Sequence, residues 1–214
     1  TKEYAKIGAL ASAVEMIKTG STFACDMYHF PESIVSALNE AGLRGVVCGP
    51  QTQWPPREGG DDGSVRRELD SQLASNKAES KVNYGVATHA VYTCDEDTLL
   101  KGKELAEKHD SYLSIHISET RKEVADCHAK TGMYPVEYLD SIDYFIPKKT
   151  ICAHGSWVKK SEMRTMAARE AILAHCPSSN MKLACGGTAS LPAYRDAEWR
   201  YAWARMGPHR VDLA

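Results

Sequence analysis

The sequence predicts an α/β fold in which short buried strands alternate with helices, either as a (β/α)8 barrel or as a doubly wound parallel sheet. Strand and helix patterns alternate about six times along the 214 residues, as they do when helical crossovers join parallel strands. The strand candidates are continuous apolar runs, which is typical of a sheet covered by helices. They contain neither GxGxxG nor GxxxxGK[ST], which weakens the nucleotide-binding doubly wound alternative.

Each element has its own local signals. Gly20 and Gly42 end helical patterns, Pro31 fits the first turn of a helix, and Asp95 is a good N-cap. The loop over 49–64 is rich in proline, glycine and aspartate and is longer than most connections, so it is either a lid or a mobile insertion. Helical spacing of apolar residues predicts helices over residues 1–19, 31–42, 65–75, 95–109, 121–132, 135–143 and 160–170. Apolar runs predict strands over residues 21–28, 43–49, 82–90, 112–119, 150–156 and 171–179.

Composition excludes several classes of protein. The net charge is −2 with both signs interspersed, so the chain lacks the basic stripe of a nucleic-acid-binding protein. Its apolar runs are shorter than a membrane span, and no signal peptide is visible. The seven cysteines form no CxxC motif and mostly lie in or beside apolar runs, as buried thiols do in a reducing compartment. We therefore expect a cytoplasmic protein that binds neither nucleic acid nor membrane.

Four histidines close strand candidates: His89, His116, His154 and His175. In a parallel barrel the carboxyl ends of all strands meet at one rim, so these side chains would converge there. Each alone is more commonly a hydrogen-bonded core residue, and for His175 we favour a structural role because the turn-forming segment CPSSN follows it. His29 also follows a strand candidate and is a weaker candidate for the rim. Random placement would scatter the four, so their joint position predicts a functional site.

The strongest cluster is HISE, residues 116–119. His116 and Ser118 share one face of the predicted strand, and Glu119 lies just past its end. Imidazole is a neutral ligand suited to Zn²⁺ or Fe²⁺, and a carboxylate near a metal-bound water can take its proton and deliver it to a leaving group. An HxxE pattern often occurs by chance, so the prediction depends on His154 closing the next strand.

At these segments the chain resembles the amidohydrolase superfamily, in particular the branch of 5-methylthioadenosine/S-adenosylhomocysteine deaminases and the related triazine hydrolases. The matching segments are MIKTGSTFACDMY, AGLRGVV, HAVYTC, SIHISET, CAHGSWV and AHCPSSNMKLACGG. The resemblance implies hydrolytic deamination of an adenosine-like nucleoside by metal-activated water. It implies that His116 is a metal ligand, that Glu119 shuttles the proton, and that His154 orients or polarises the water and the substrate. It also implies that the substrate is bound by His89, Glu119 and His154.

The chain also departs from the pattern of that family. The family uses an HxH pair on its first barrel strand and an aspartate on its last strand, and both are absent from this sequence. The expected fold is therefore a partial (β/α)8 barrel of about six βα units over residues 1–197, lacking the first strand, the last strand and the family's β-sandwich. One divalent metal, zinc or iron, is the implied cofactor, and this chain would supply His116 to it.

Residues 198–214 form an atypical tail. Where the family continues with an apolar strand and Gly-Thr-Asp-Gly, the chain reads EWRYAWARMGPHRVDLA. A shift of the reading frame by one nucleotide can spell Gly-Val followed by Gly-Thr-Asp-Gly, so we interpret the tail as an out-of-frame translation. The alternative is a divergent tail that packs as an amphipathic helix. The coding DNA at positions 204–206 decides between them.

Several functional alternatives stay open from the sequence. The substrate of the enzyme can also be guanine or a triazine, because the leaving group depends on pocket residues that the sequence does not place. Trp54 and Arg57 in the long loop are candidate contacts to a purine and to a ribose or carboxylate, although exposed positions are commoner in such a loop. Arg44 at a strand start either reaches the rim or is a surface residue. A non-catalytic fragment is the alternative of another class, since three of the usual four metal ligands are missing. An open barrel also predicts self-association through its strand edges.

Overall fold

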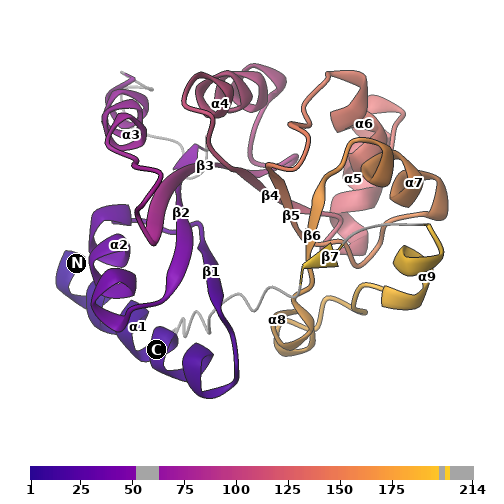
Figure 1. Cartoon of the computed structure of the whole chain (residues 1–214). Helices are drawn as coiled ribbons and strands as arrows, with labels where there is room; N and C mark the ends of the chain where they lie inside the picture. Colours follow the sequence, from indigo (N-terminus) through magenta and orange to yellow (C-terminus); the bar gives the residue numbers. More distant parts are fainter. Residues whose placement is uncertain (52–62, 198–200, 203–214) are drawn as a thin grey trace.

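The computed structural model describes residues 1–51, 63–197 and 201–202, and within them the strands form one curved parallel sheet with helices on its outer face (Figure 1). The strands follow one another across the sheet in chain order, and every neighbouring pair is parallel. A doubly wound sheet would reverse its strand order partway, so this arrangement is that of a partial (β/α)8 barrel. The strands are β1 (Phe23–Asp26), β2 (Arg44–Gln51), β3 (Val82–Ala90), β4 (Leu113–Ile117), β5 (Thr150–His154), β6 (Ile172–Ala174) and β7 (Tyr201–Ala202).

The predicted helices are present close to their predicted bounds, and two short helices follow them. Pro177 starts α8 inside the segment predicted as strand 171–179, because a proline suits the first helical position and cannot donate to a strand ladder. The helices are α1 (Lys2–Lys18), α2 (Pro31–Ala41), α3 (Ser64–Ala74), α4 (Glu96–Lys108), α5 (Arg121–Thr131), α6 (Pro135–Ser141), α7 (Lys160–Ala168), α8 (Pro177–Lys182) and α9 (Leu191–Asp196).

The tail contributes one feature that the sequence did not predict. Tyr201 and Ala202 form a short strand that pairs in parallel with β6 at Leu173 and Ala174. The remainder of the tail, and with it the frameshift interpretation, lies outside the described residues, as do Trp54 and Arg57.

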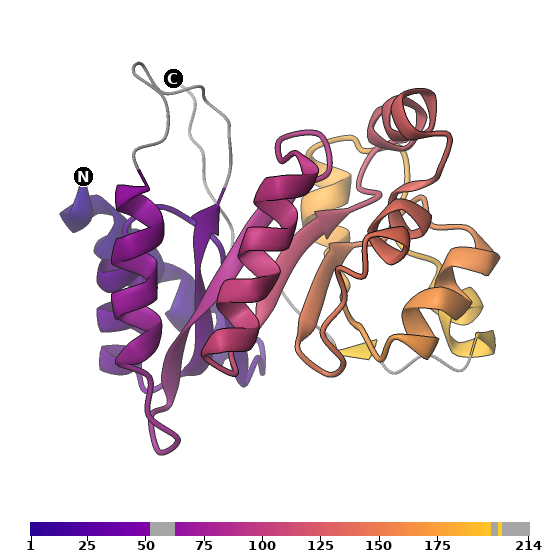
Figure 2. The same ribbon diagram turned by 90° about the horizontal axis from the view of Figure 1, so that it is seen from above.

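Two apolar layers flank the sheet. The outer layer consists of two clusters: one packs α1 and α2 on β1 to β3, and the other lies between the strands and helices α3 to α7 and α9. Figure 2 shows α3 and α4 in front of the sheet on this side. The inner layer fills the concave side and consists of small side chains, which suits the narrow interior of a barrel. Its buried members are Val46, Cys48, Ala87, Ile151, Ala153, Ala174 and Cys176. All seven cysteines are free thiols, as predicted, and six of them are buried.

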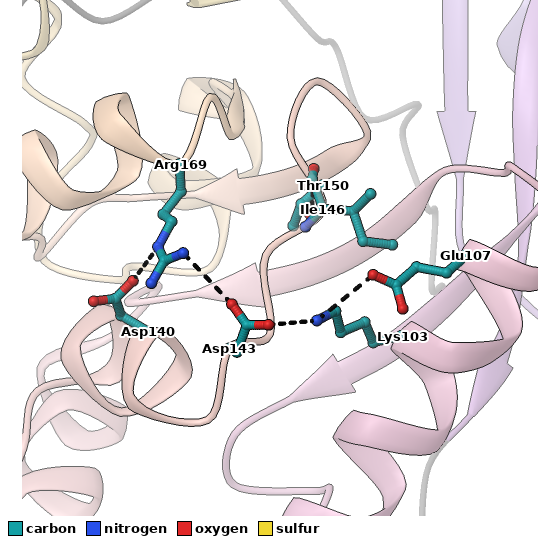
Figure 3. A network of polar contacts seen from close by, with 7 residues as sticks. All are labelled: Lys103, Glu107, Asp140, Asp143, Ile146, Thr150 and Arg169. Carbon is teal, nitrogen blue, oxygen red and sulfur yellow. Dashed lines mark hydrogen bonds and ion pairs between the residues drawn. The ribbon is translucent and has the colours of Figure 1, made fainter.

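A polar network on the outside fixes the loop that enters β5 (Figure 3). Lys103 of α4 lies 3.0 Å from a carboxylate oxygen of Asp143, and this cation lowers the pKa of that carboxyl. Arg169 contacts Asp140 at 2.6 Å and Asp143 at 3.4 Å, which ties the end of α7 to the same loop. The hydroxyl of Thr150 then accepts a backbone N–H from this loop at 2.7 Å. These contacts set the start of the strand that carries His154.

Helix α1 turns an apolar face to solvent. Its apolar spacing predicted a helix, but the side chains that it buries in the core are Ala13 and Met16. The face formed by Tyr4, Ile7, Val14 and Ile17 is exposed, with Tyr4 at 76%. β1, the neighbouring strand, pairs with β2 on one side and has no second strand partner among the described residues. A contiguous apolar face beside an open strand edge marks a surface that associates.

We expect the purified chain to self-associate through this exposed face of α1. The double variant Ile7→Lys/Val14→Lys should shift the weight-average mass by light scattering toward the monomer, because two charges disrupt apolar contact. The matched control, Met181→Lys/Leu183→Lys, alters two apolar residues at the end of α8 that are at least as exposed, and it should leave the mass unchanged. A wild-type chain that stays monomeric at high protein concentration would contradict this expectation.

No helix in residues 1–51 and 63–197 combines the length and apolarity needed to cross a membrane.

Candidate active site at the carboxyl ends of the strands

His116 lies on β4 and points toward the inner side of the sheet, where its ring meets those of His89 and His154. Its Nδ1 is 2.9 Å from the backbone carbonyl oxygen of His89. A carbonyl oxygen can accept but not donate, so Nδ1 carries the proton and Nε2 carries the lone pair. A carbonyl partner of this kind is the usual way in which a metal-binding imidazole is oriented.

His154 closes β5 with an unusual backbone. Strand alternation alone would point its side chain to the outer side with Cys152, but His154 has a φ of 75°, in the left-handed region. Its ring instead stacks on that of His116, with centroids 5.3 Å apart and planes 24° apart. Its Nδ1 lies 3.0 Å from the side-chain amide nitrogen of Asn180. Burial lowers the pKa of His154, and the nearby Glu119 carboxylate opposes that shift.

Glu119 follows β4 and brings a carboxylate to the same cluster. Its Oε1 is 3.6 Å from Nε2 of His154 and accepts a hydrogen bond from the thiol of Cys185 at 3.5 Å. The structure therefore brings together the three residues on which the sequence prediction depended, His116, Glu119 and His154. An imidazole, a carboxylate and a second imidazole at this spacing are suited to accepting, holding and transferring a proton.

The turn between His116 and Glu119 is held by a second carboxylate. Ser118 has a φ of 48°, a left-handed conformation that residues with a Cβ rarely adopt. The carboxylate of Glu123 accepts the backbone N–H of Ser118 at 2.7 Å and that of Glu119 at 2.8 Å. Burial raises the pKa of Glu123 to about 7, against the opposing effect of these hydrogen bonds.

Trp157 connects two of the loops around the site through hydrogen bonds. Its backbone N–H donates to the carbonyl of Ser118 at 3.0 Å, and its indole N–H donates to the carbonyl of Cys185 at 3.0 Å. The guanidinium of Arg121 lies 4.2 Å from the centroid of the indole ring. A Cβ on Gly187 would come within 3.1 Å of the ring, so glycine permits this close packing. These contacts hold the thiol of Cys185 against Glu119.

The other predicted site residues lie at different distances from this cluster. His89 closes the inner face of β3; its Nδ1 is 2.8 Å from the hydroxyl of Thr93, and its ring centroid is 4.8 Å from that of His116. His175 is buried just after β6, where burial lowers its pKa. His29 instead lines a cavity of about 270 Å³ beside the end of β2. Arg44 is the first residue of β2 and is exposed, so the possibility that it reaches the rim is wrong.

Sequence reasoning missed four residues that complete the cluster, namely Glu123, Trp157, Asn180 and Cys185. Trp157, Asn180 and Cys185 do lie in segments on which the family resemblance rested. Asn180 was interpreted as a turn former, whereas its buried amide reaches a histidine 26 positions earlier in the sequence. Glu123 carried a recognisable signal, because Thr120 and Glu123 have the spacing of a capping box.

The metal site predicted from the sequence depends on His116. The imidazole of His116 has the orientation of a ligand, but no group of three or more histidine, cysteine, aspartate or glutamate side chains in residues 1–51 and 63–197 is arranged to hold a metal ion. A zinc site uses at least three protein ligands. Among the described residues, His116 is the histidine that the sequence predicted as a ligand, and this role stays a prediction.

Parallel strands that bring imidazoles and a carboxylate to one rim give this chain the architecture of a partial βα barrel with a candidate active site at the carboxyl ends of its strands. The profile of the amidohydrolase family matches residues 1–198, and the chain belongs to this family.

Two curated relatives show which members of this family the chain is similar to. The chain is 39% identical over 184 residues to a 5'-deoxyadenosine deaminase of Methanosphaera stadtmanae, covering 84% of this chain and 42% of that enzyme. It is 36% identical over 184 residues to a 5-methylthioadenosine/S-adenosylhomocysteine deaminase of Thermodesulfovibrio yellowstonii, covering 86% and 42% respectively. The chain therefore spans less than half the length of the curated relatives it matches.

Solved structures give the same picture of the fold. An adenosine deaminase from Xanthomonas campestris with bound zinc matches with a TM-score of 0.85 at 26% identity, over 97% of this chain and 47% of that one. A zinc complex of an atrazine chlorohydrolase from Arthrobacter aurescens matches with a TM-score of 0.81 over 97% of this chain and 49% of that one, and at 17% identity this likeness shows the fold alone.

Proposed function

We propose that this chain carries the acid–base portion of the active site of a metal-dependent hydrolase that removes the exocyclic amine of an adenosine-like nucleoside, of the methylthioadenosine or S-adenosylhomocysteine type. The observation that carries the proposal is the contact of Glu119 with His154, beside the ring of His116. The names of the curated relatives support a nucleoside substrate rather than a triazine. We propose that the substrate is a small molecule and that the enzyme acts in the cytoplasm.

In this proposal each residue has one task. His116 is the ligand that the described part of the chain supplies to a divalent metal, for which we favour zinc over iron. When bound, this metal lowers the pKa of water. Glu119 takes a proton from the attacking water and passes it to the departing amine, so that water adds to the ring carbon, the C–N bond breaks and ammonia leaves. His154 orients the water and polarises the substrate, and His89 contacts the substrate at the wall of the site.

A chimera tests this proposal. Residues 1–197 would replace the matching segment of the Methanosphaera stadtmanae deaminase, so that the relative supplies the remaining ligands. We expect the zinc-loaded chimera to release ammonia from 5'-deoxyadenosine, methylthioadenosine or S-adenosylhomocysteine. A chimera that folds and binds zinc but releases ammonia from none of these would refute the proposal.

The 214-residue chain alone should bind zinc weakly. We expect well under one zinc per chain after dialysis, and no ammonia release, because ligand number and geometry determine the affinity of such sites. The zinc that does bind should decrease in the variant His116→Asn and be unchanged in His128→Asn, which alters a histidine on α5. Nearly one zinc per chain together with turnover would show that the site is complete.

A further inference from the structure

The most informative unassigned group in the molecule is the buried carboxylate of Glu123. Glu123 is 3% exposed, and the hydrogen bonds of its carboxylate go to the backbone of the turn beside the site. Its two oxygens are both used on backbone N–H groups, one from Ser118 and one from Glu119. These two residues form the turn that leads from the strand bearing His116 to the carboxylate that contacts His154.

We propose that Glu123 is a positioning residue that holds the turn at Ser118 and so places the Glu119 carboxylate against His154. This inference rests on the proposed function, in which Glu119 moves the proton.

The turn depends on a partner of this kind for two reasons. Ser118 is held in the left-handed region, which is unfavourable for a residue with a Cβ unless its surroundings fix it. Its N–H and that of Glu119 both donate to this one carboxylate, and the buried N–H of Ser118 requires an acceptor in the protein interior. A carboxylate supplies two acceptor oxygens at the right separation, whereas a glutamine supplies one acceptor and one donor. With glutamine at position 123, the side-chain NH₂ group would therefore face one of these two backbone N–H groups, and no hydrogen bond could form there.

The position of Glu123 on its helix explains how it reaches the turn. Thr120 is the N-cap of α5, and its hydroxyl accepts the backbone N–H of Glu123 at 3.1 Å. This bond fixes the first turn of the helix and directs the Glu123 side chain back along the chain. From this position the carboxylate of Glu123 reaches past Thr120 and accepts the backbone N–H groups of Ser118 and Glu119. The carbonyl of Ser118 is held separately by the backbone N–H of Trp157.

The chain contains a matched control for a purely structural role. Glu162 of α7 is also buried, with 0% exposure, and its carboxylate accepts two backbone N–H groups, from Val136 at 3.0 Å and from Lys159 at 2.9 Å. Burial raises its pKa as well. It joins α6 to α7, and its bonds involve neither Ser118 nor Glu119. The variants Glu123→Gln and Glu162→Gln thus remove the same kind of interaction from two places.

The test compares both variants in the full 214-residue chain by NMR, which requires no catalysis. In Glu123→Gln we expect amide hydrogen exchange at Ser118 and Glu119 to accelerate about 10- to 100-fold, the loss expected for hydrogen bonds to a charged acceptor. Nuclear Overhauser contacts between the Glu119 side chain and the His154 ring should disappear. In Glu162→Gln the exchange should accelerate at Val136 and Lys159 instead, and the contacts between Glu119 and His154 should persist.

Two results would overturn the inference. One is that Glu123→Gln keeps the contacts between Glu119 and His154 while the helix remains folded. The other needs no variant and holds even if Glu123→Gln does not fold: the amides of Ser118 and Glu119 in the wild-type chain exchange as fast as those of an open loop. Because these readouts report position and not turnover, the inference can fail while the proposed deaminase activity stands. Likewise, an inactive chimera would leave the positioning of Glu119 unaffected.

Discussion

Replacing Glu119 by glutamine in the active chimera is expected to lower kcat for ammonia release by about 10²- to 10⁴-fold, the usual contribution of a positioned general acid–base group. Glutamine has the same shape and can still accept the hydrogen bond from Cys185, but it cannot take up and release a proton. KM for the nucleoside should change little, because the loss falls on the proton transfers and not on binding.

The control for this variant is Glu137→Gln. Glu137 accepts a backbone N–H from Tyr134 at 3.0 Å on α6, away from the imidazole cluster, so its loss should leave kcat unchanged. If Glu119→Gln kept most of the rate in a correctly folded, zinc-loaded chimera, another group would have to carry the proton and the assignment of Glu119 would be wrong. A large rise in KM at constant kcat would instead make Glu119 a binding residue.

The alternation of side chains along each strand was sufficient to predict where two histidines of the site lie. His116 follows Ser114 and His89 follows Ala87 on the inner face, so both imidazoles converge for a reason visible in the pattern of each strand. His154 breaks this rule, because its parity on β5 points outward and only its left-handed backbone turns the ring inward. This left-handed conformation of His154 depends on tertiary contacts, and no local pattern in CAHGS predicts it.

Helix α1 shows a second limit of sequence reasoning. Its apolar spacing predicted a helix correctly, but periodicity alone did not identify the face that meets the sheet. Small Ala13 and unbranched, flexible Met16 pack against α2 and the strands, while the β-branched Ile7 and Val14 face solvent. A close approach between a helix and its neighbours favours small side chains at the contact, which a count of apolar residues does not detect.

The tail and the long loop illustrate a third limit. The two-residue strand at Tyr201–Ala202 has no strand pattern in the sequence and forms where β6 offers a partner, so pairing overrides weak local preference there. Most of the out-of-frame interpretation and the substrate contacts assigned to Trp54 and Arg57 concern residues outside those that the structure describes. They stay predictions, which the coding DNA and substitution in the chimera can test.

The substitution Gly155→Ala is expected to destabilise the fold by roughly 2–5 kcal/mol, as the sum of two effects. Gly155 follows His154 with a φ of 58°, where a side chain adds about 1–2 kcal/mol of backbone strain. Its Cβ would also lie 2.5 Å from the hydroxyl of Tyr194 and 2.6 Å from a methyl of Leu173, and overpacking of this kind costs about 1–3 kcal/mol. Tyr194 cannot move aside freely, since it is fully buried and donates to the Gly155 carbonyl at 2.7 Å.

The matched control separates these two effects. Gly132 ends α5 with a φ of 75°, but a Cβ there would meet nothing within 4 Å, so Gly132→Ala should show the backbone strain alone, about 1–2 kcal/mol. Urea unfolding of both variants at one protein concentration gives the comparison, because equal slopes allow the midpoints to be read as differences in stability. Equal losses of stability in the two variants would mean that the side chains around Tyr194 shift to accommodate the added Cβ. The packing that holds the turn after His154 would then be too soft to fix the ring against His116.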